Sequence, residues 1–292
     1  MLDSSSVTIG FVGIGVMGNG MVSNLIRSGY NVHIYSRTKS KAEKVIGLGA
    51  KWHDSVADLV KKVNVVITMV GYPRDVEEIY LHDQGIVSHA NPGAYLVDMT
   101  TSSPSLAKRI YEEAKKRRLY SLDAPVSGGD IGAREATLSI MAGGDREVFE
   151  TMRPIFLAMG KNIVYQGAAG SGQHTKMCNQ IAIASNMIGV CEALVYARRS
   201  GLDPITVLKS IETGAAGSWS LSNLGPRIIN HDFDPGFYVK HFIKDMRIAL
   251  ESAKEMGLQT PGLSLAESLY EQLAEMGEGE SGTQALYKLI DK

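Results

Sequence analysis

The sequence predicts an α/β protein: a doubly wound sheet with helices on both faces, followed by an all-α C-terminal domain joined to it by a long interdomain helix. Two observations support this prediction. Strand and helix patterns alternate from residue 7 to about residue 165, and only helical periodicity follows. Residues 173–199 contain no proline and one glycine, so they can form a single helix of about 40 Å.

Length and charge narrow the functional classes. A chain of 292 residues exceeds what one hydrophobic core usually serves, which favours two domains. The net charge of -1 argues against nucleic acid or an anionic membrane as a partner and favours a small molecule. Residues 1–6 lack the pattern of a secretion signal. Cys178 and Cys191, about 20 Å apart on the predicted helix, are too distant for a disulfide. We therefore expect a cytoplasmic protein with free thiols.

The first strand, residues 7–12, runs into a glycine-rich turn and an amphipathic helix. In a dinucleotide-binding turn, one glycine permits the tight turn, the next lets backbone approach a pyrophosphate, and the last lets helix pack on strand. We predict that this turn binds a dinucleotide, which makes the sheet a Rossmann domain. The residues concerned are Gly13, Ile14, Gly15, Val16, Met17 and Gly18.

The end of the second strand, residues 31–35, indicates which dinucleotide is used. An NAD enzyme usually places an acid there to bind the ribose hydroxyls. This chain instead has Ser36, Arg37 and Thr38, followed by two lysines, a set suited to a 2′-phosphate. NADP is the predicted cofactor, with NAD possible.

The remaining elements follow the same rhythm of buried apolar runs and amphipathic segments. The strands are expected at 64–70, 94–99, 119–122, 137–141 and 162–165, and helices at 54–62, 73–81, 103–118 and 146–158. Later helices are expected at 204–212, 237–256, 263–276 and 284–290. The alternation predicts a parallel sheet, with an NADP-binding Rossmann domain at 1–165 and an all-helical substrate and oligomerisation domain at 166–292. Ligands of such sheets lie beyond the carboxyl ends of the strands, which selects Met69, Val70 and Asp98–Thr101.

The long helix is apolar around most of its circumference, which predicts burial between two bodies of protein and an oligomer. Asn179, Gln180, Ser185 and Asn186 interrupt its apolar run. The run is therefore shorter than the roughly 20 residues that a membrane span needs.

Several separated motifs together resemble the β-hydroxyacid dehydrogenases. They are Gly13–Gly18, Asp123-Ala124-Pro125-Val126-Ser127-Gly128-Gly129, Gly170-Ser171-Gly172-Gln173-His174-Thr175-Lys176-Met177-Cys178-Asn179-Gln180 and Lys244-Asp245, in the family's order and spacing. The resemblance covers nearly the whole chain. Residues 213–218 and Asn179-Gln180 look most like tartronate semialdehyde reductases, whereas Ser36–Thr38 looks like NADP-using glyoxylate/succinic semialdehyde reductases, so the substrate stays open.

The resemblance implies a role for each matching residue. Lys176 matches the catalytic lysine, which exchanges a proton with the reacting oxygen while hydride moves to or from the nicotinamide, and an ammonium suits a developing alkoxide. Asn179, one turn later, would orient the substrate or the lysine. Ser127, Gly128 and Gly129 match the loop that binds the substrate carboxylate, which would also accept a sulfonate.

The other matches are cofactor and substrate positions. Thr101 matches a residue near the nicotinamide, and Lys244 matches a cofactor-site lysine. Phe237 and Asp245 match positions beside the substrate. Trp219 could cap the pocket or simply pack. The sequence shows no metal-ligand cluster, so no metal is expected.

The predicted function is NAD(P)-dependent reduction of a small semialdehyde acid, or oxidation of the corresponding 3-hydroxy acid, by a 3-hydroxyisobutyrate dehydrogenase-like enzyme acting as a homo-oligomer, a dimer or tetramer. Three alternatives share the fold: an imine reductase, a phosphogluconate dehydrogenase and a non-catalytic NADPH-binding module. Phosphogluconate dehydrogenases are normally much longer chains. The other two classes generally lack the lysine, so Lys176 counts against both.

Overall fold

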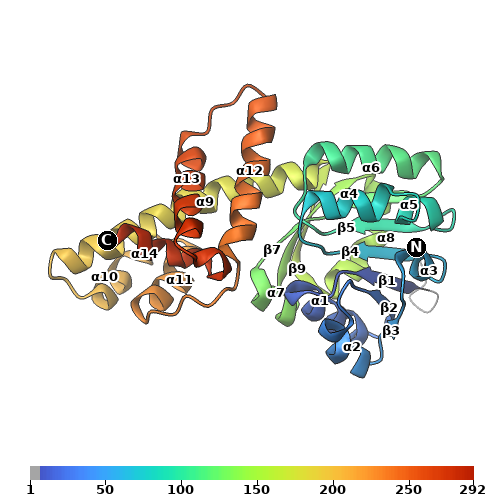
Figure 1. The fold of residues 1–292 in the computed structure, drawn as a ribbon, viewed down its shortest axis with the longest axis horizontal. Helices are drawn as coiled ribbons and strands as arrows, with labels where there is room; N and C mark the ends of the chain where they lie inside the picture. The colour runs from blue at the N-terminus through green and yellow to red at the C-terminus, as the bar shows by residue number, and fades with distance from the viewer. Residues whose placement is uncertain (1–6) are drawn as a thin grey trace. The chain divides into compact units, whose positions relative to one another are not determined.

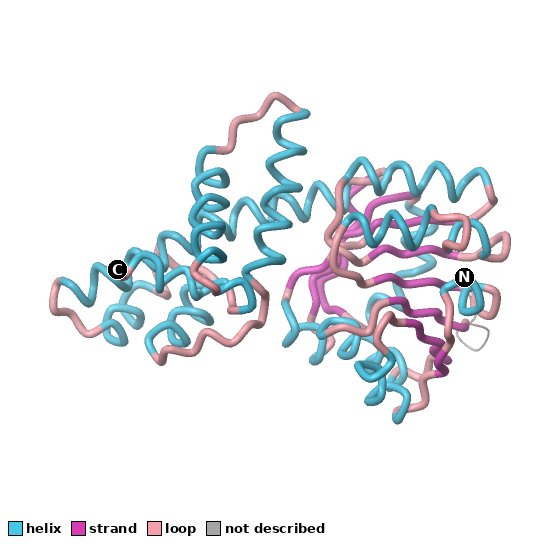
Figure 2. Tube along the Cα trace, viewed as in Figure 1, coloured by secondary structure: helices cyan, strands magenta, loops and turns pink. Residues whose placement is uncertain are grey.

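The computed structural model describes residues 7–292, and the chain divides into two compact units, Met1–Lys176 and Met177–Lys292. Residues 1–6, in which we expect no secretion signal, lie outside the described residues. Within the described residues, the first unit contains every strand of the sheet, and the second is built from helices (Figures 1 and 2).

Six strands of the first unit form the predicted parallel sheet, in the order β3-β2-β1-β4-β5-β6. They are β1 (Thr8–Val12), β2 (Asn31–Tyr35), β3 (Lys51–Trp52), β4 (Val65–Thr68), β5 (Tyr95–Asp98) and β6 (Tyr120–Asp123). Along β1, Ile9 and Phe11 enter one hydrophobic core and Val12 enters another. Successive side chains of a strand point to opposite faces, so an almost wholly apolar strand is buried on both.

The last three strands depart from the parallel arrangement. They are β7 (Val126–Ser127), β8 (Leu138–Gly144) and β9 (Gly160–Gly167). β8 runs antiparallel to both β6 and β7, and β9 pairs in parallel with β8. A parallel connection needs a crossover of about a dozen residues or more, and the segment between β7 and β8 is shorter. The prediction of a parallel sheet is therefore wrong at this junction, although the doubly wound class is confirmed.

Helices cover both faces of the sheet, as Figure 2 shows. Side chains of α1 (Val16–Arg27) and α8 (Arg146–Leu157) belong to one core, and side chains of α3 (Val56–Val60), α4 (Pro73–Leu81) and α6 (Pro104–Lys116) belong to the other. Four short elements were not predicted: the 3-10 helix Lys39–Ala42, α2 (Glu43–Gly47), α5 (Ile86–His89) and α7 (Gly129–Glu135). They are too short to show a helical period in the sequence.

The predicted long helix is confirmed as α9 (Ser171–Arg199), an unbroken element of 29 residues. By length and composition alone it could cross a membrane, but 44% of its most apolar window is buried inside the fold. Met187, Cys191 and Leu194 belong to the core of the second unit. Part of its apolar surface is therefore used in packing within the second unit.

The second unit packs five further helices around this core (Figure 1). They are α10 (Pro204–Ile211), α11 (Trp219–Ile229), α12 (Val239–Glu255), α13 (Pro261–Glu275) and α14 (Tyr287–Ile290), with 3-10 turns at Glu278–Glu280 and Thr283–Leu286. The sequence did not predict α11, because Gly225 and Pro226 lie inside it. An added Cβ at Gly225 would lie 3.2 Å from Leu208, so the glycine allows α10 to approach closely.

Candidate functional site

The turn between β1 and α1 is built around three glycines. A Cβ added to Gly13 would lie 2.2 Å from the carbonyl oxygen of Met69, and one added to Gly18 would lie 2.1 Å from the carbonyl oxygen of Gly13. Neither distance is sterically tolerable, so a larger residue would displace β4 or α1 from the turn. These glycines therefore have the tight-turn and close-packing roles that a dinucleotide site requires.

Gly15 differs because it faces open space. An added Cβ there would meet no atom within 4 Å. Gly15 is also the N-cap residue of α1, whose first turn holds no acidic side chain. Ile14 is buried, Met17 is half-buried and Val16 is exposed. The open approach and the positive end of the helix fit the pyrophosphate of a dinucleotide.

The end of β2 carries the side chains predicted to bind the 2′-phosphate. Ser36 Oγ accepts a hydrogen bond of 3.4 Å from the backbone N–H of Ile14, which connects this end to the glycine turn. Arg37 and Thr38 are exposed. Arg37 Nη1 lies 3.3 Å from Asp75 Oδ1, and the arginine side chain remains 77% exposed. Asp75 thus holds the guanidinium in place while leaving it exposed to solvent. Asp75 was not predicted as a site residue, although an acidic residue in the first turn of the predicted helix at 73–81 could have drawn attention to it.

The ends of β4 and β5 lie beside the glycine turn. The carbonyl oxygen of Met69 limits the space at Gly13. The backbone N–H of Val70 donates to Thr100 Oγ1 over 3.0 Å. Thr101, the next residue, is half-buried. The structure therefore brings three predicted cofactor residues, Met69, Val70 and Thr101, to one edge of the sheet.

Two carboxylates are buried where β5 and β6 end. Asp98 and Asp123 are direct partners in the register of the two strands. Asp98 Oδ1 accepts hydrogen bonds from Thr68 Oγ1 at 2.7 Å and from the N–H of Thr100 at 3.1 Å. Burial raises the pKa of Asp98 to about 6, although these two hydrogen bonds oppose the shift. Burial also raises the pKa of Asp123, against the backbone N–H groups that stabilise its charge.

Asp123 binds the start of α9. Its Oδ1 accepts from the N–H of Gly170 at 2.7 Å, and its Oδ2 accepts from the N–H of Gln173 at 2.8 Å. A Cβ at Gly172 would lie 2.6 Å from the Asp123 carbonyl oxygen, so only glycine allows this approach. The carboxylate occupies the end of the helix where a negative charge is favoured.

Gln173 joins the same helix to the segment after β5. Its Oε1 accepts from the N–H of Ser102 at 2.9 Å, and its Nε2 donates to the carbonyl oxygen of Thr100 at 2.8 Å. Lys176 follows one turn later and is only 6% exposed. Asp123 and Gln173 lie within the sequence motifs, but their neighbours in sequence predicted no role for either residue. Both could have been selected from their positions: Asp123 is a polar residue at the end of a predicted strand, and Gln173 follows two glycines at the start of the predicted long helix.

The segment predicted to bind the substrate carboxylate joins β7 to α7: Ser127 ends β7, and Gly129 begins α7. Ser127 is half-buried and Gly128 is exposed. The φ angles of Gly128 and Gly129 are +126° and +62°, in the region that side chains disfavour. Main-chain atoms, rather than side chains, therefore form this part of the surface.

In the second unit, polar side chains of α9 and α12 form one chain of contacts. Asn179 Nδ2 donates to Gln180 Oε1 at 2.7 Å, and Gln180 Nε2 donates to Asp245 Oδ2 at 2.6 Å. Lys244 Nζ lies 2.7 Å from Asp245 Oδ1. Asp245 is 1% exposed: its Oδ2 accepts the hydrogen bond from Gln180, whereas its Oδ1 forms the ion pair with Lys244 and accepts no hydrogen bond from the described residues. The ring of Phe237 packs at a tilt against that of Phe242, with ring centroids 5.5 Å apart and an angle of 57° between the ring planes.

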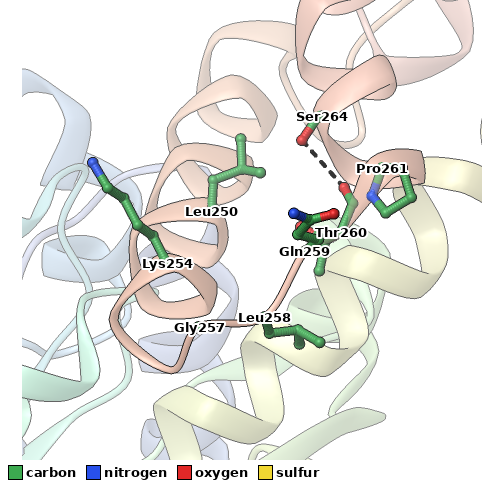
Figure 3. Close-up of a pocket in the computed structure, with 8 residues that line it drawn as sticks. All are labelled: Leu250, Lys254, Gly257, Leu258, Gln259, Thr260, Pro261 and Ser264. Atoms are coloured by element: carbon green, nitrogen blue, oxygen red, sulfur yellow. Dashed lines mark hydrogen bonds between the residues drawn. The ribbon is translucent and has the colours of Figure 1, made fainter.

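The surface hollow between the end of α12 and the start of α13 contains none of these residues. Figure 3 shows its lining, which includes Leu250, Lys254 and Leu258, and the hydrogen bond from Ser264 Oγ to the Thr260 carbonyl oxygen. Its open form distinguishes it from an enclosed substrate pocket. Among residues 7–292, no three His, Cys, Asp or Glu side chains are grouped so as to hold a metal ion.

Two family models match the chain in succession. The NAD binding domain of 6-phosphogluconate dehydrogenase matches residues 8–167. The model described as NAD-binding of NADP-dependent 3-hydroxyisobutyrate dehydrogenase matches residues 170–290. Both matches, with the glycine turn, define the protein as an NAD(P)-dependent oxidoreductase.

Individual relatives agree with these models. An uncharacterized oxidoreductase of Bacillus subtilis is 64% identical, covering 97% of this chain and 98% of the relative. The 2-hydroxy-3-oxopropionate reductase of Escherichia coli is 37% identical, covering 97% of each. The structure of Mycobacterium tuberculosis 3-hydroxyisobutyrate dehydrogenase with L-serine is 30% identical, with a TM-score of 0.90, covering 98% of this chain and 99% of that one.

The chain belongs to the β-hydroxyacid dehydrogenase family, and it is an NAD(P)-dependent dehydrogenase of the 3-hydroxyisobutyrate dehydrogenase type that acts on the CH–OH group of small hydroxyacids. The predicted family and enzyme class are confirmed. An imine reductase from Myxococcus stipitatus, at 18% identity and a TM-score of 0.65, shares the fold alone.

The pKa of Asp98 predicts a pH dependence of stability. In the folded protein Asp98 keeps its proton up to about pH 6, whereas in the unfolded chain it loses the proton near pH 3.8. The protonated Asp98 therefore stabilises the fold fully below pH 3.8, and this contribution to the free energy of unfolding is lost as the pH rises through 6. The shift corresponds to at most about 3 kcal/mol. We expect Asp98→Asn to flatten the dependence of unfolding free energy on pH between about 4 and 7, measured by urea titration.

The exposed Asp83 offers a matched control, because Asp83→Asn should leave the pH profile unchanged. Parallel profiles for Asp98→Asn and the wild type would show that Asp98 does not titrate in this range.

Proposed function

We propose that the protein uses NADPH to reduce a small semialdehyde acid, or NADP to oxidise the corresponding 3-hydroxy acid, with Lys176 as the proton donor and acceptor. We assign nucleotide binding to residues 1–165 and substrate binding and oligomerisation to residues 166–292. The observation that carries the proposal is a nearly buried lysine, 6% exposed, on the first turns of a helix whose start is fixed by Asp123 and Gln173. Ordinary helix lysines are solvated, so this burial needs a chemical reason.

Reduction requires a hydride at the carbonyl carbon and a proton at its oxygen. The dinucleotide, held at the glycine turn and by Thr101 and Lys244, supplies the hydride when bound. Lys176 gives its proton to the developing alkoxide, and in oxidation it accepts the proton of the alcohol. Its ammonium also stabilises negative charge on the oxygen before the proton moves.

The substrate is proposed to bind through its acid group and a second polar contact. Ser127, Gly128 and Gly129 hold the carboxylate, whereas Asn179 and Phe237 border the rest of the molecule. The names of the similar proteins support a short acid: the Escherichia coli relative is a 2-hydroxy-3-oxopropionate reductase, and the Mycobacterium tuberculosis structure holds L-serine.

We also propose an oligomeric state and a cellular location for the enzyme. Exposed apolar side chains of the second unit, among them Tyr196 and Trp219, support a homo-oligomer, either a dimer or a tetramer. Cys178 and Cys191 are free thiols, which supports a cytoplasmic location. No nucleic acid or membrane partner is proposed, because the net charge is -1.

The first prediction concerns the cofactor. NADPH should exceed NADH in kcat/KM by at least about tenfold, because Arg37 and its neighbours bind the 2′-phosphate. Arg37→Ala should remove most of this preference by lowering the value for NADPH alone. Arg153→Ala, at another exposed arginine, is the control. Equal efficiency with both cofactors in the wild type would refute the assignment.

The second prediction tests Lys176. Lys176→Ala should lower kcat by about 10² or more, while NADPH affinity measured by fluorescence titration stays the same. Lys176→Arg should fail similarly, because guanidinium does not release a proton near neutral pH. Lys209→Ala, at an exposed lysine of α10, is the control. Retention of more than about a tenth of kcat would assign the proton to another group.

The third prediction concerns the carboxylate loop. Semialdehyde acids of two to four carbons should exceed propionaldehyde in kcat/KM by about 10² or more, since the uncharged aldehyde leaves the anion site unfilled. Ser127→Ala should narrow this ratio by lowering the value for the acids alone. Equal rates with propionaldehyde would contradict the loop assignment and favour the imine reductase alternative.

A further inference from the structure

A buried carboxylate lies beside the side chains that are proposed to bind the 2′-phosphate of NADP. Asp75 belongs to the first turn of α4 and is 7% exposed. Its Oδ2 accepts a hydrogen bond of 3.1 Å from the backbone N–H of Tyr72, and its Oδ1 lies 3.3 Å from Arg37 Nη1. All three residues belong to the first unit, so the ion pair is complete within that unit.

The carboxylate is held more firmly than the guanidinium. A negative charge is stabilised at the N-terminal end of a helix, and the backbone N–H of Tyr72 fixes the orientation of the Asp75 side chain. The Arg37 side chain is 77% exposed, and it meets Asp75 through Nη1. The other nitrogens of a guanidinium also carry N–H donors. A ligand can therefore reach Arg37 from solvent while Asp75 keeps its position.

Asp75 has two opposing effects on a 2′-phosphate that binds Arg37. A phosphate monoester carries about two negative charges near neutral pH, and its repulsion by a like charge a few ångströms away weakens binding by roughly fivefold in water. The carboxylate also occupies the cation that the phosphate needs. In the other direction, the ion pair orients Arg37, but exposed ion pairs contribute little or nothing measurable. Repulsion and competition therefore outweigh orientation.

We propose that Asp75 is a specificity-determining residue: it competes with the 2′-phosphate for Arg37, and it thereby lowers the preference for NADP and keeps NAD usable as a cofactor. The inference rests on the proposed use of NADPH, because it concerns how large that preference is. NAD carries a 2′-hydroxyl, which has no charge for Asp75 to repel. The end of β2 thus supplies the cation that attracts the phosphate, and α4 supplies the anion that limits this attraction.

The test uses the adenosine halves of the two cofactors, adenosine 2′,5′-bisphosphate and adenosine 5′-monophosphate, with Kd measured by calorimetry. These ligands differ only in the 2′-phosphate, and neither takes part in hydride transfer. Asp75→Asn removes the charge, while its amide oxygen can still accept the hydrogen bond from Tyr72. We expect the Kd for the bisphosphate to fall about fivefold in this variant, with the Kd for the monophosphate unchanged.

Glu77→Gln is the matched control. Glu77 lies on the same helix and is also paired with an arginine, Arg109, which has no part in the proposed nucleotide site. The substitution removes the same charge from α4, and both Kd values should stay within about twofold of the wild type. Added salt should shrink the gain in Asp75→Asn, because exposed charges are screened. A gain caused by a changed helix start would not depend on salt.

Arg37→Ala tests the competition itself. If Asp75 acts through the guanidinium, Asp75→Asn should change the ratio of the two Kd values by less than about twofold in this background. A crystal structure of the wild type with the bisphosphate tests the same point without a substitution: Arg37 Nη1 should lie beyond about 4 Å from Asp75. A retained ion pair with the phosphate bound, or the full gain without Arg37, would refute competition.

Different results would overturn the inference and the function on which it rests. If the wild type prefers the bisphosphate but Asp75→Asn binds it no more tightly, the inference is wrong and the preference for NADP stands. The same conclusion follows if Glu77→Gln gives an equal gain. If neither the wild type nor Asp75→Asn binds the bisphosphate more tightly than the monophosphate, the proposed use of NADPH is itself wrong.

Discussion

The contact between the Asp123 carboxylate and the first turn of α9 is the interaction on which the rest of the first unit's site depends. It joins the end of β6 to the helix that carries Lys176, through hydrogen bonds of 2.7 and 2.8 Å. Burial of this carboxylate is costly, and the backbone N–H groups and the helix dipole offset that cost. Because the bonds are directional, they fix the position of the helix start, and the Gln173 amide fixes the segment of Thr101 to the same turn.

The glycine turn and the helix α9 are held in position by different kinds of contact. The nucleotide turn depends on absent side chains: glycines at 13 and 18 allow contacts that any Cβ would prevent. The position of α9 depends on buried polar groups that bind one another: Asp123 accepts from the backbone N–H of Gln173, and Asp245 accepts from the side chain of Gln180.

Much of the fold could be predicted because its signals are local. The alternation of apolar runs gave the strands β1, β2, β4 and β5, and the absence of proline gave α9. Elements without a local period were missed: β3 has two residues, and α11 contains Gly225 and Pro226. The predicted direction of β8 was also wrong, because a short apolar run predicts a buried strand but does not by itself fix the direction of that strand relative to its neighbours.

The sequence by itself determined the doubly wound class, the dinucleotide turn, the long helix and the family, since backbone demands and motif spacing are written in neighbouring residues. It also selected Lys176 and Asn179, but only through a resemblance. Only the tertiary structure decided which polar residues are buried together. Gln173 meets Ser102 across 71 residues of sequence, and Gln180 meets Asp245 across 65. No local pattern encodes such pairings, because packing brings these residues together.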